Sequence, residues 1–170
     1  MPEIAPYTLR PAGLDDAFFL QAVFASARER ELALLGWSGQ QAQAFLAMQT
    51  RAQNQHYAAY FPQAVTWIVL RDGTPAGRII VDRSGPVVCL LDITLLPEHR
   101  NAGLGTALIG DLLAEAERDG KRVTLHVEPA NPANRLYRRL GFAPVAESSV
   151  SVEMEWRPVR LESQTEVAHA

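Results

Sequence analysis

The most constraining feature of the sequence is a glycine turn that joins an apolar segment to a helical pattern. A run of mostly apolar and β-branched residues covers 87–96, and Pro97 follows it directly. This composition predicts a buried strand that ends before the proline, which has no N–H for a sheet ladder. Apolar residues then recur at helical spacing over 107–118. The sequence therefore predicts a strand, a turn at 100–106 and a helix, in that order.

The turn itself is expected to bind an anion. Gly103 and Gly105 let the backbone approach a ligand closely, and the N–H groups that open the next helix lie at the positive end of its dipole. Phosphate is the usual occupant of such a turn. No Lys-Ser/Thr follows the second glycine, so the turn is not a Walker loop. Leu108 stands where the dinucleotide fingerprint requires a third glycine, so that interpretation is excluded as well.

Two segments, in this order, resemble the signatures of the GNAT acetyltransferases. Arg-x-x-Gly-x-Gly at 100–105, after a strand ending in Leu-Leu-Pro, resembles the acyl-CoA loop of that family. Asn131, Tyr137 and the Gly-Phe pair at 141–142 resemble its second signature. Each signature alone is weak, whereas both in sequence with a predicted strand between them form a strong signal. The resemblance is sharp over 87–142 and diffuse elsewhere.

The resemblance implies the GNAT fold, an α/β (α+β) arrangement with a mixed, mostly antiparallel sheet of about seven strands. Helices are expected on both faces of the sheet, with a splay between the fourth and fifth strands. Hydrophobic periodicity and turn residues supply the other elements. The predicted helices cover 14–35, 38–60, 107–118 and 132–141, and the predicted strands cover 7–10, 64–71, 75–82, 87–96, 122–128, 142–147 and 150–156.

Length and composition predict a single domain over 1–160 with a sizeable core, and the resemblance implies that it is an N-acetyltransferase (GNAT) domain. The chain has 170 residues, of which 48% are hydrophobic. Residues 161–170 are polar and unpatterned, and we expect them to form a disordered tail.

Charge and cysteine content narrow the class of protein further. The net charge is −3, from 16 basic and 19 acidic residues, and this balance gives no support for a nucleic-acid partner. The single cysteine excludes an internal disulfide framework and fits a reducing compartment. No apolar stretch reaches membrane-spanning length, and no signal peptide is expected at the N-terminus. These observations predict a cytoplasmic protein without a membrane partner, and family habit implies a possible homodimer.

The resemblance implies acetyl-CoA as co-substrate and no metal. The backbone of Ile93, Leu95 and Leu96 is expected to hold the acetyl group and pantetheine. Asn101 departs from the glycine that the family usually has after the arginine, which affects only the fine geometry of the loop. The other expected acetyl-CoA ligands are Arg100, Asn101, Ala102, Gly103, Leu104, Gly105, Thr106, Asn131, Asn134 and Tyr137.

Two catalytic roles follow from the resemblance. The Leu95 N–H is the candidate oxyanion donor, because a donor placed in advance stabilises the charge that develops on the carbonyl oxygen. Tyr137 is the candidate general acid that protonates the departing CoA thiolate, and a phenol with a pKa of about 10 suits that task. Without the surrounding signature, Tyr137 would be interpreted as an ordinary tyrosine packed on the core.

The general base is less well determined, and Asp92 and Glu128 are the two candidates. A carboxylate within an apolar strand is costly unless it is paired or functional, so Asp92 is either a base or the partner of an arginine. His126 and Glu128 lie at the end of the next strand, where we interpret His126 as solvated. We expect Glu98 at the surface and Cys89 to be a buried small hydrophobe. An ordered water is the alternative base.

The predicted function is an N-acetyltransferase that moves acetyl from acetyl-CoA directly to a primary amine of a small molecule or protein. His56, Tyr57 and Tyr60 are candidate residues of the acceptor pocket. A longer acyl donor or an alcohol acceptor is an alternative within enzymes. A non-catalytic acyl-CoA-binding module or sensor is the main alternative outside them. A toxin acting on charged transfer RNA would be expected to show a basic face, which the sequence lacks.

Overall fold

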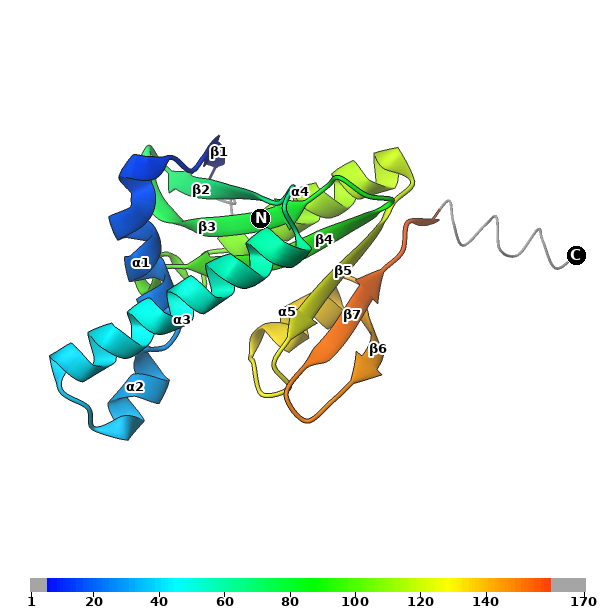
Figure 1. Ribbon diagram of the computed structural model, residues 1–170. Helices are drawn as coiled ribbons and strands as arrows, with labels where there is room; N and C mark the ends of the chain where they lie inside the picture. Colours follow the sequence, from blue (N-terminus) through cyan, green and yellow to red (C-terminus); the bar gives the residue numbers. More distant parts are fainter. Residues whose placement is uncertain (1–5, 160–170) are drawn as a thin grey trace, which may run out of the picture. The chain divides into compact units, whose positions relative to one another are not determined.

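A computed structural model describes residues 6–159, which form seven strands, five α-helices and two 3-10 helices. Figure 1 labels the strands and the α-helices. In chain order they are β1 (Tyr7–Pro11), η1 (Leu14–Asp16), α1 (Ala17–Ser26), α2 (Glu29–Leu35), α3 (Gly39–Tyr60), β2 (Val65–Arg71), β3 (Thr74–Asp82), β4 (Val87–Leu95), η2 (Pro97–His99), α4 (Leu104–Asp119), β5 (Arg122–Val127), α5 (Ala133–Arg139), β6 (Ala143–Glu147) and β7 (Val152–Trp156).

The strands form one mixed sheet in the order β1-β2-β3-β4-β5-β7-β6. The pairs β1–β2, β5–β7 and β6–β7 are antiparallel, and β4 runs parallel to β5. The parallel register joins Val87–Leu90 to Arg122–Leu125, while β4 itself continues to Leu95. The sheet confirms the mixed, mostly antiparallel seven-stranded fold expected from the sequence. Among the described helices, none is both long and apolar enough to cross a membrane.

Backbone contacts divide the described chain into two compact units. The first unit contains the residues up to Ile80 together with Asp92–Leu104. The second contains Val81–Leu91 and the residues from Gly105 onward. The single domain over 1–160 stays a prediction, and the expected tail at 161–170 lies outside the described residues.

In the first unit, the predicted helix over 14–35 is divided into η1, α1 and α2, so the expectation of one continuous helix was wrong. Ser26 explains the interruption after α1. Its hydroxyl donates to the Val23 carbonyl at 2.7 Å, and such back-bonding competes with the helical ladder. The Arg28 guanidinium then lies 3.7 Å from the centre of the Phe24 ring, which is buried. This contact anchors the turn between the two helices on the core.

In the first unit, the residues at the helix ends and at the hairpin turn are of the types that such positions favour. α2 ends at Gly36, whose φ of 63° is the left-handed cap that glycine favours. A capping box precedes α3, because Ser38 and Gln41 exchange hydrogen bonds of 3.0 and 3.3 Å. Asp72 and Gly73 both have positive φ, as the tight two-residue turn between β2 and β3 requires.

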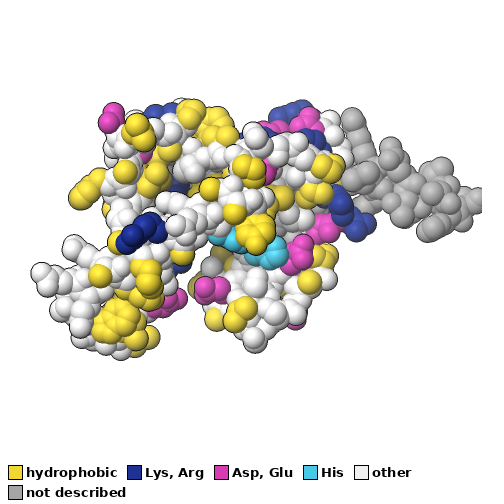
Figure 2. Space-filling model, in the orientation of Figure 1, with side chains coloured by type: hydrophobic (Ala, Val, Ile, Leu, Met, Phe, Trp, Pro, Cys, Tyr) yellow, Lys and Arg dark blue, Asp and Glu magenta, His cyan; other side chains and the backbone are white. Residues whose placement is uncertain are grey.

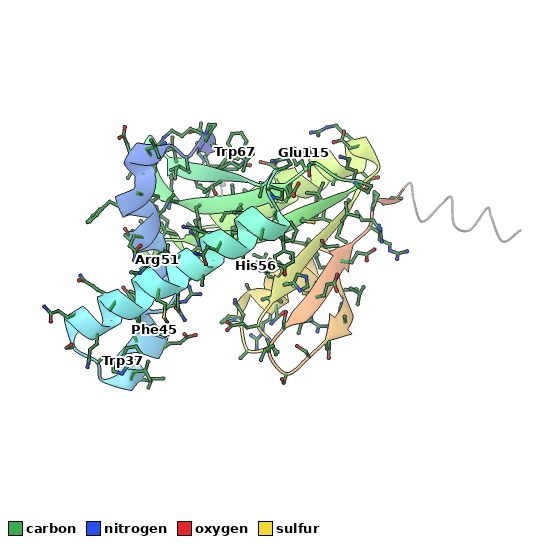
Figure 3. The ribbon with its side chains drawn as sticks, viewed as in Figure 1. Trp37, Phe45, Arg51, His56, Trp67 and Glu115 are labelled. Carbon is green, nitrogen blue, oxygen red and sulfur yellow. The ribbon has the colours of Figure 1, made fainter. Side chains whose placement is uncertain are left out.

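Exposed hydrophobic side chains gather around α2 and the beginning of α3, as Figure 2 shows. Leu34 on α2 is 89% exposed. Trp37, between the two helices, packs edge-on against Phe45 of α3 with ring centres 5.0 Å apart (Figure 3). The aromatic pair therefore stabilises the connection from α2 to α3 without burying it.

The second unit is built on the strands β5, β7 and β6. Val123, Leu125 and Val127 of β5 are buried, which confirms the predicted alternation along this strand. Met154 of β7 lies opposite Leu125 and is fully buried. α4 contributes a buried apolar face, formed by Leu108, Ile109, Leu112, Leu113 and Ala116.

We predict that Asp16 makes the unfolding free energy of the protein depend on pH in the acidic range. Arg10 donates two hydrogen bonds of 2.8 Å to the Asp16 carboxylate, and the Gly13 N–H donates a third at 2.7 Å. These bonds lower the pKa of Asp16 from 3.8 to about 2. Because the folded state prefers the ionised form, this stabilisation is complete above about pH 4 and is lost as the pH falls towards 2. Asp16→Asn should therefore flatten a plot of unfolding free energy against pH in this window. An equally steep plot for the variant would contradict the prediction.

Candidate active site

The predicted phosphate loop lies between η2 and α4. Asn101 and Gly103 have φ values of 60° and 80°, and α4 begins at Leu104. Glycine adopts such values freely, and asparagine tolerates them better than most other residues. The asparagine that replaces the usual glycine after the arginine therefore suits this backbone. The loop leads directly into the helix N-terminus, whose first N–H groups are free of intrahelical partners by geometry.

Arg100 links the loop to the end of β4. Its Nε donates to the Leu95 carbonyl at 2.9 Å. The side chain is exposed, and its contact fixes the backbone beside the candidate oxyanion donor. The sequence predicted Arg100 as an acetyl-CoA ligand but gave no sign of this bond, because a contact between a side chain and a carbonyl five residues earlier leaves no pattern.

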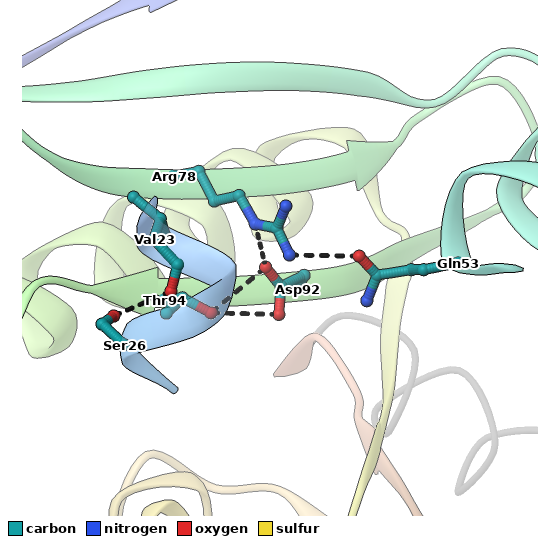
Figure 4. A network of polar contacts seen from close by, with 6 residues as sticks. All are labelled: Val23, Ser26, Gln53, Arg78, Asp92 and Thr94. Atoms are coloured by element: carbon teal, nitrogen blue, oxygen red, sulfur yellow. Dashed lines mark hydrogen bonds and ion pairs between the residues drawn. The ribbon is translucent and has the colours of Figure 1, made fainter. Parts of the chain in front are cut away.

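Asp92 of β4 is held by an arginine, as Figure 4 shows. The Arg78 Nε on β3 donates to Asp92 Oδ2 at 2.6 Å, and the Thr94 hydroxyl lies 3.2 Å from both carboxylate oxygens. Arg78 Nη2 also donates to Gln53 of α3 at 3.2 Å. The Arg78 side chain is only 7% exposed and that of Asp92 is 21% exposed. Of the two interpretations of Asp92, the structure therefore contains the structural pair with an arginine.

Tyr57 of α3 belongs to the same surroundings. Burial raises the pKa of its phenol to about 12, and the negative charge of Asp92 adds to this increase. Tyr57 therefore remains protonated at neutral pH and acts only as a hydrogen-bonding group. The other two acceptor candidates lie beside it, with the His56 ring centre 4.8 Å from that of Tyr60 and 5.9 Å from that of Tyr57.

Gly77 of β3 allows β3 and β4 to approach each other next to the candidate oxyanion donor. A Cβ built at Gly77 would clash with the Thr94 carbonyl oxygen and lie 2.9 Å from the Leu95 Cα. The Leu96 N–H also donates to the Ala76 carbonyl at 2.8 Å, which fixes this approach. Since both neighbouring atoms belong to the backbone, no side chain can rotate away to make room for a Cβ.

We predict that Gly77→Ala displaces the end of β4, lowers the unfolding free energy by about 1–3 kcal/mol and reduces turnover. Gly85→Ala is the matched control, because nothing lies within 4 Å of a Cβ at Gly85. Urea unfolding and a turnover assay of both variants provide the measurement. Equal stability and turnover of the two variants would show that the close approach is unimportant.

The remaining candidate residues lie on and before α5 in the second unit. Tyr137 is 8% exposed, and its ring packs against Phe142 with centres 5.9 Å apart. Just before α5, Asn131 Oδ1 accepts from the Ala133 N–H at 2.9 Å. Asn134 Nδ2 lies within 3.2 Å of the carbonyl oxygens of Glu128, Pro129 and Asn131. The two asparagines thus hold the turn that precedes α5.

The candidate residues fall into two groups. The β4 group contains Asp92, Ile93, Leu95 and Leu96 with the loop residues up to Leu104, and it lies in the first unit. The α5 group contains Glu128, Asn131, Asn134 and Tyr137, and it lies in the second unit, to which the loop residues Gly105 and Thr106 also belong. The side chains of Glu128 and His126 are exposed. Cys89 is half-buried, and its sulfur accepts from the Thr124 hydroxyl at 3.7 Å, as expected for a small packed side chain. Within residues 6–159, no cluster of His, Cys, Asp and Glu is suited to a metal ion.

Sequence reasoning missed Gly77 and Arg78, although both leave a signal. A glycine inside a predicted strand often marks a close backbone approach. An arginine among apolar strand residues requires a buried partner. For Arg78, that partner could have been sought in the neighbouring predicted strand, where Asp92 is the carboxylate.

Solved structures of other proteins share this architecture. The N-acetyltransferase PaiA of Thermoplasma acidophilum, in complex with coenzyme A, is 16% identical, with a TM-score of 0.67 over 89% of this chain and 99% of that chain. Histone acetyltransferase HPA2 and related acetyltransferase of Corynebacterium glutamicum is 20% identical, with a TM-score of 0.65 over 90% and 97%. The ribosomal-protein-S18-alanine N-acetyltransferase of Escherichia coli is also 20% identical, with a TM-score of 0.58 over 89% and 94%.

At these identities the similarity shows a shared fold, which is that of the GCN5-related acetyltransferases. The family itself is shown by sequence, because the acetyltransferase (GNAT) family pattern matches residues 21–142. The chain therefore belongs to the GNAT acetyltransferase family.

Proposed function

We propose that the protein is an N-acetyltransferase that transfers the acetyl group of acetyl-CoA directly to a primary amine of a small molecule or protein. The loop from Arg100 to Thr106 carries this proposal. Its positive φ values at Asn101 and Gly103 turn the backbone into the N-terminus of α4, where N–H groups can receive a pyrophosphate. The complex of the Thermoplasma acidophilum relative with coenzyme A supports the same cofactor here.

The reaction needs an oxyanion donor and an acid, and the chain offers one of each. The amine nitrogen attacks the thioester carbonyl, and the Leu95 N–H stabilises the negative charge on its oxygen. The C–S bond then breaks, and Tyr137 donates its phenolic proton to the departing thiolate. Arg100 supports the first step indirectly, because its bond to the Leu95 carbonyl fixes the peptide backbone there.

The attacking amine must also lose a proton, and Asp92 and Glu128 are the candidate bases. The 2.6 Å bond from the buried Arg78 favours a structural role for Asp92, since protonation would weaken this charge-assisted bond. Glu128 has an exposed side chain, and its carbonyl is fixed by bonds from Asn131 and Asn134. We therefore favour Glu128, or a water that it orients, as the proton acceptor.

Titration of acetyl-CoA into the Gly103→Val variant tests the loop directly. Valine at a φ of 80° costs roughly 1–2 kcal/mol and obstructs the approach of the pyrophosphate, so we expect the affinity to fall by at least about tenfold. Gly120→Val is the matched control, because Gly120 has a φ of 65° at the other end of α4. Unchanged affinity in Gly103→Val, or an equal loss in Gly120→Val, would contradict the proposal.

A further inference from the structure

The first unit contains a hollow of about 450 Å³ between η1, α1, α3, β2 and β3. This volume is in the range of small-molecule sites, which span about 300–1,000 Å³. Its lining includes none of the residues expected to bind acetyl-CoA. We call it the α1–α3 hollow and define it by Leu20, Thr50, Tyr57, Phe61, Arg78 and Ile80.

Arg78 gives the hollow an unusual buried charge. A guanidinium has five N–H donors, and among the described residues Arg78 uses Nε towards Asp92 and Nη2 towards Gln53. Both N–H groups of Nη1 and the second N–H of Nη2 are thus left for an acceptor. Only 7% of the Arg78 side chain is exposed, and the part that lines the hollow is therefore its main access to a ligand. The planar fork of arginine matches a carboxylate in geometry as well as charge.

Thr50 provides a second, independent observation. Its hydroxyl oxygen is buried and has no hydrogen-bond partner among the described residues, although the side chain lines the hollow. A buried polar group without a partner is costly, and a ligand oxygen in the hollow would remove that cost. Arg78 and Thr50 come from different elements, β3 and α3, so the same packing does not explain both.

The remaining lining determines the class of ligand. Arg78 is the only charged residue among the described residues that line the hollow, so an ammonium group would meet no carboxylate there. Leu20, Phe61 and Ile80 offer apolar surface. We propose that the α1–α3 hollow binds a small carboxylate, with its oxygens on Arg78 and Thr50 and its hydrocarbon part against these apolar side chains. Tyr57 lines this hollow and is also a candidate residue of the acceptor pocket, but the binding of a carboxylate here goes beyond the proposed acetyl transfer and does not depend on it.

Isothermal titration with three probes that share one carbon skeleton tests the proposal. The probes are 4-methylpentanoate, 4-methylpentanamide and 4-methylpentylamine, which differ only in the group that faces Arg78. We expect the carboxylate to bind at least about tenfold more tightly than the amide, since charge-assisted hydrogen bonds are the stronger ones. The amine should bind most weakly. Equal binding of carboxylate and amide, or no binding of the carboxylate, would overturn the proposal.

Two variants locate the binding. Arg78→Lys keeps the charge beside Asp92 but loses the Nη1 donors. It should lower the affinity for the carboxylate probe about tenfold or more. Thr50→Val keeps the shape of the side chain but removes its hydroxyl, and it should lower the affinity for the carboxylate probe about three- to tenfold. Arg51→Lys, on the exposed face of α3 (Figure 3), is the matched control and should change nothing. Unchanged binding in both Arg78→Lys and Thr50→Val would place the carboxylate elsewhere and overturn the assignment.

Acetyl-CoA titrated into the same variants separates this proposal from the function. If the carboxylate binds as expected and acetyl-CoA does not bind, the hollow is supported and the proposed function fails. If acetyl-CoA binds equally well to the wild type and to all these variants while the carboxylate does not bind, the proposed carboxylate site is refuted and the proposed function is unaffected.

Discussion

Replacing Tyr137 by phenylalanine is expected to lower kcat by about 100-fold or more while leaving the affinity for acetyl-CoA nearly unchanged. General acid catalysis contributes about 10²–10⁴-fold, and only the hydroxyl is removed. The ring stays packed on Phe142, so the fold should be preserved. Steady-state turnover across pH provides the measurement.

The control for this variant is Tyr7→Phe, which removes the same hydroxyl from a half-buried side chain on β1, outside the candidate site. Its turnover should match that of the wild type. If Tyr137→Phe keeps full turnover at every pH, another group protonates the thiolate and the assignment of the acid is wrong.

The second large effect concerns stability. Arg78→Met is expected to lower the unfolding free energy by about 3 kcal/mol, because it leaves the Asp92 carboxylate partly buried without its cation. Breaking a fully buried pair costs about 3–5 kcal/mol, and the 21% exposure of Asp92 places the expected value at the low end. Urea unfolding at neutral pH measures the difference.

The double variant Arg78→Met/Asp92→Leu distinguishes a lost interaction from a damaged core. Replacing both partners by apolar side chains removes the unpaired charge, so most of the lost stability should return. If the single variant loses less than about 1 kcal/mol, or the double variant is no more stable than the single one, the ion pair is not what holds β3 to β4 here.

The fold was largely predictable because its signals are local. The alternation along β5, the Ser38 capping box and the Asp72-Gly73 turn each specify structure through neighbouring residues. The break between α1 and α2 was not predicted, because the apolar spacing continues across it. There the Ser26 hydroxyl and the Arg28–Phe24 contact outweigh the periodicity.

The site was predictable only in part, because its motifs are local and its support is not. The glycine turn at Gly103 could be identified from the pattern of strand, turn and helix around it, and Asn131 before α5 from the resemblance to the second GNAT signature. The partner of Asp92 was missed although Arg78 left a signal, because the two residues lie 14 positions apart and meet only when β3 and β4 come together. The bond from Arg100 to Leu95 is equally invisible to pattern reasoning.

The most direct test of the central claim is thiol release by the purified protein with acetyl-CoA and a panel of primary amines. We predict that at least one amine produces CoA thiol together with a product that is heavier by one acetyl group. Binding of acetyl-CoA without thiol release for any amine would contradict the transferase and favour a non-catalytic acyl-CoA-binding module.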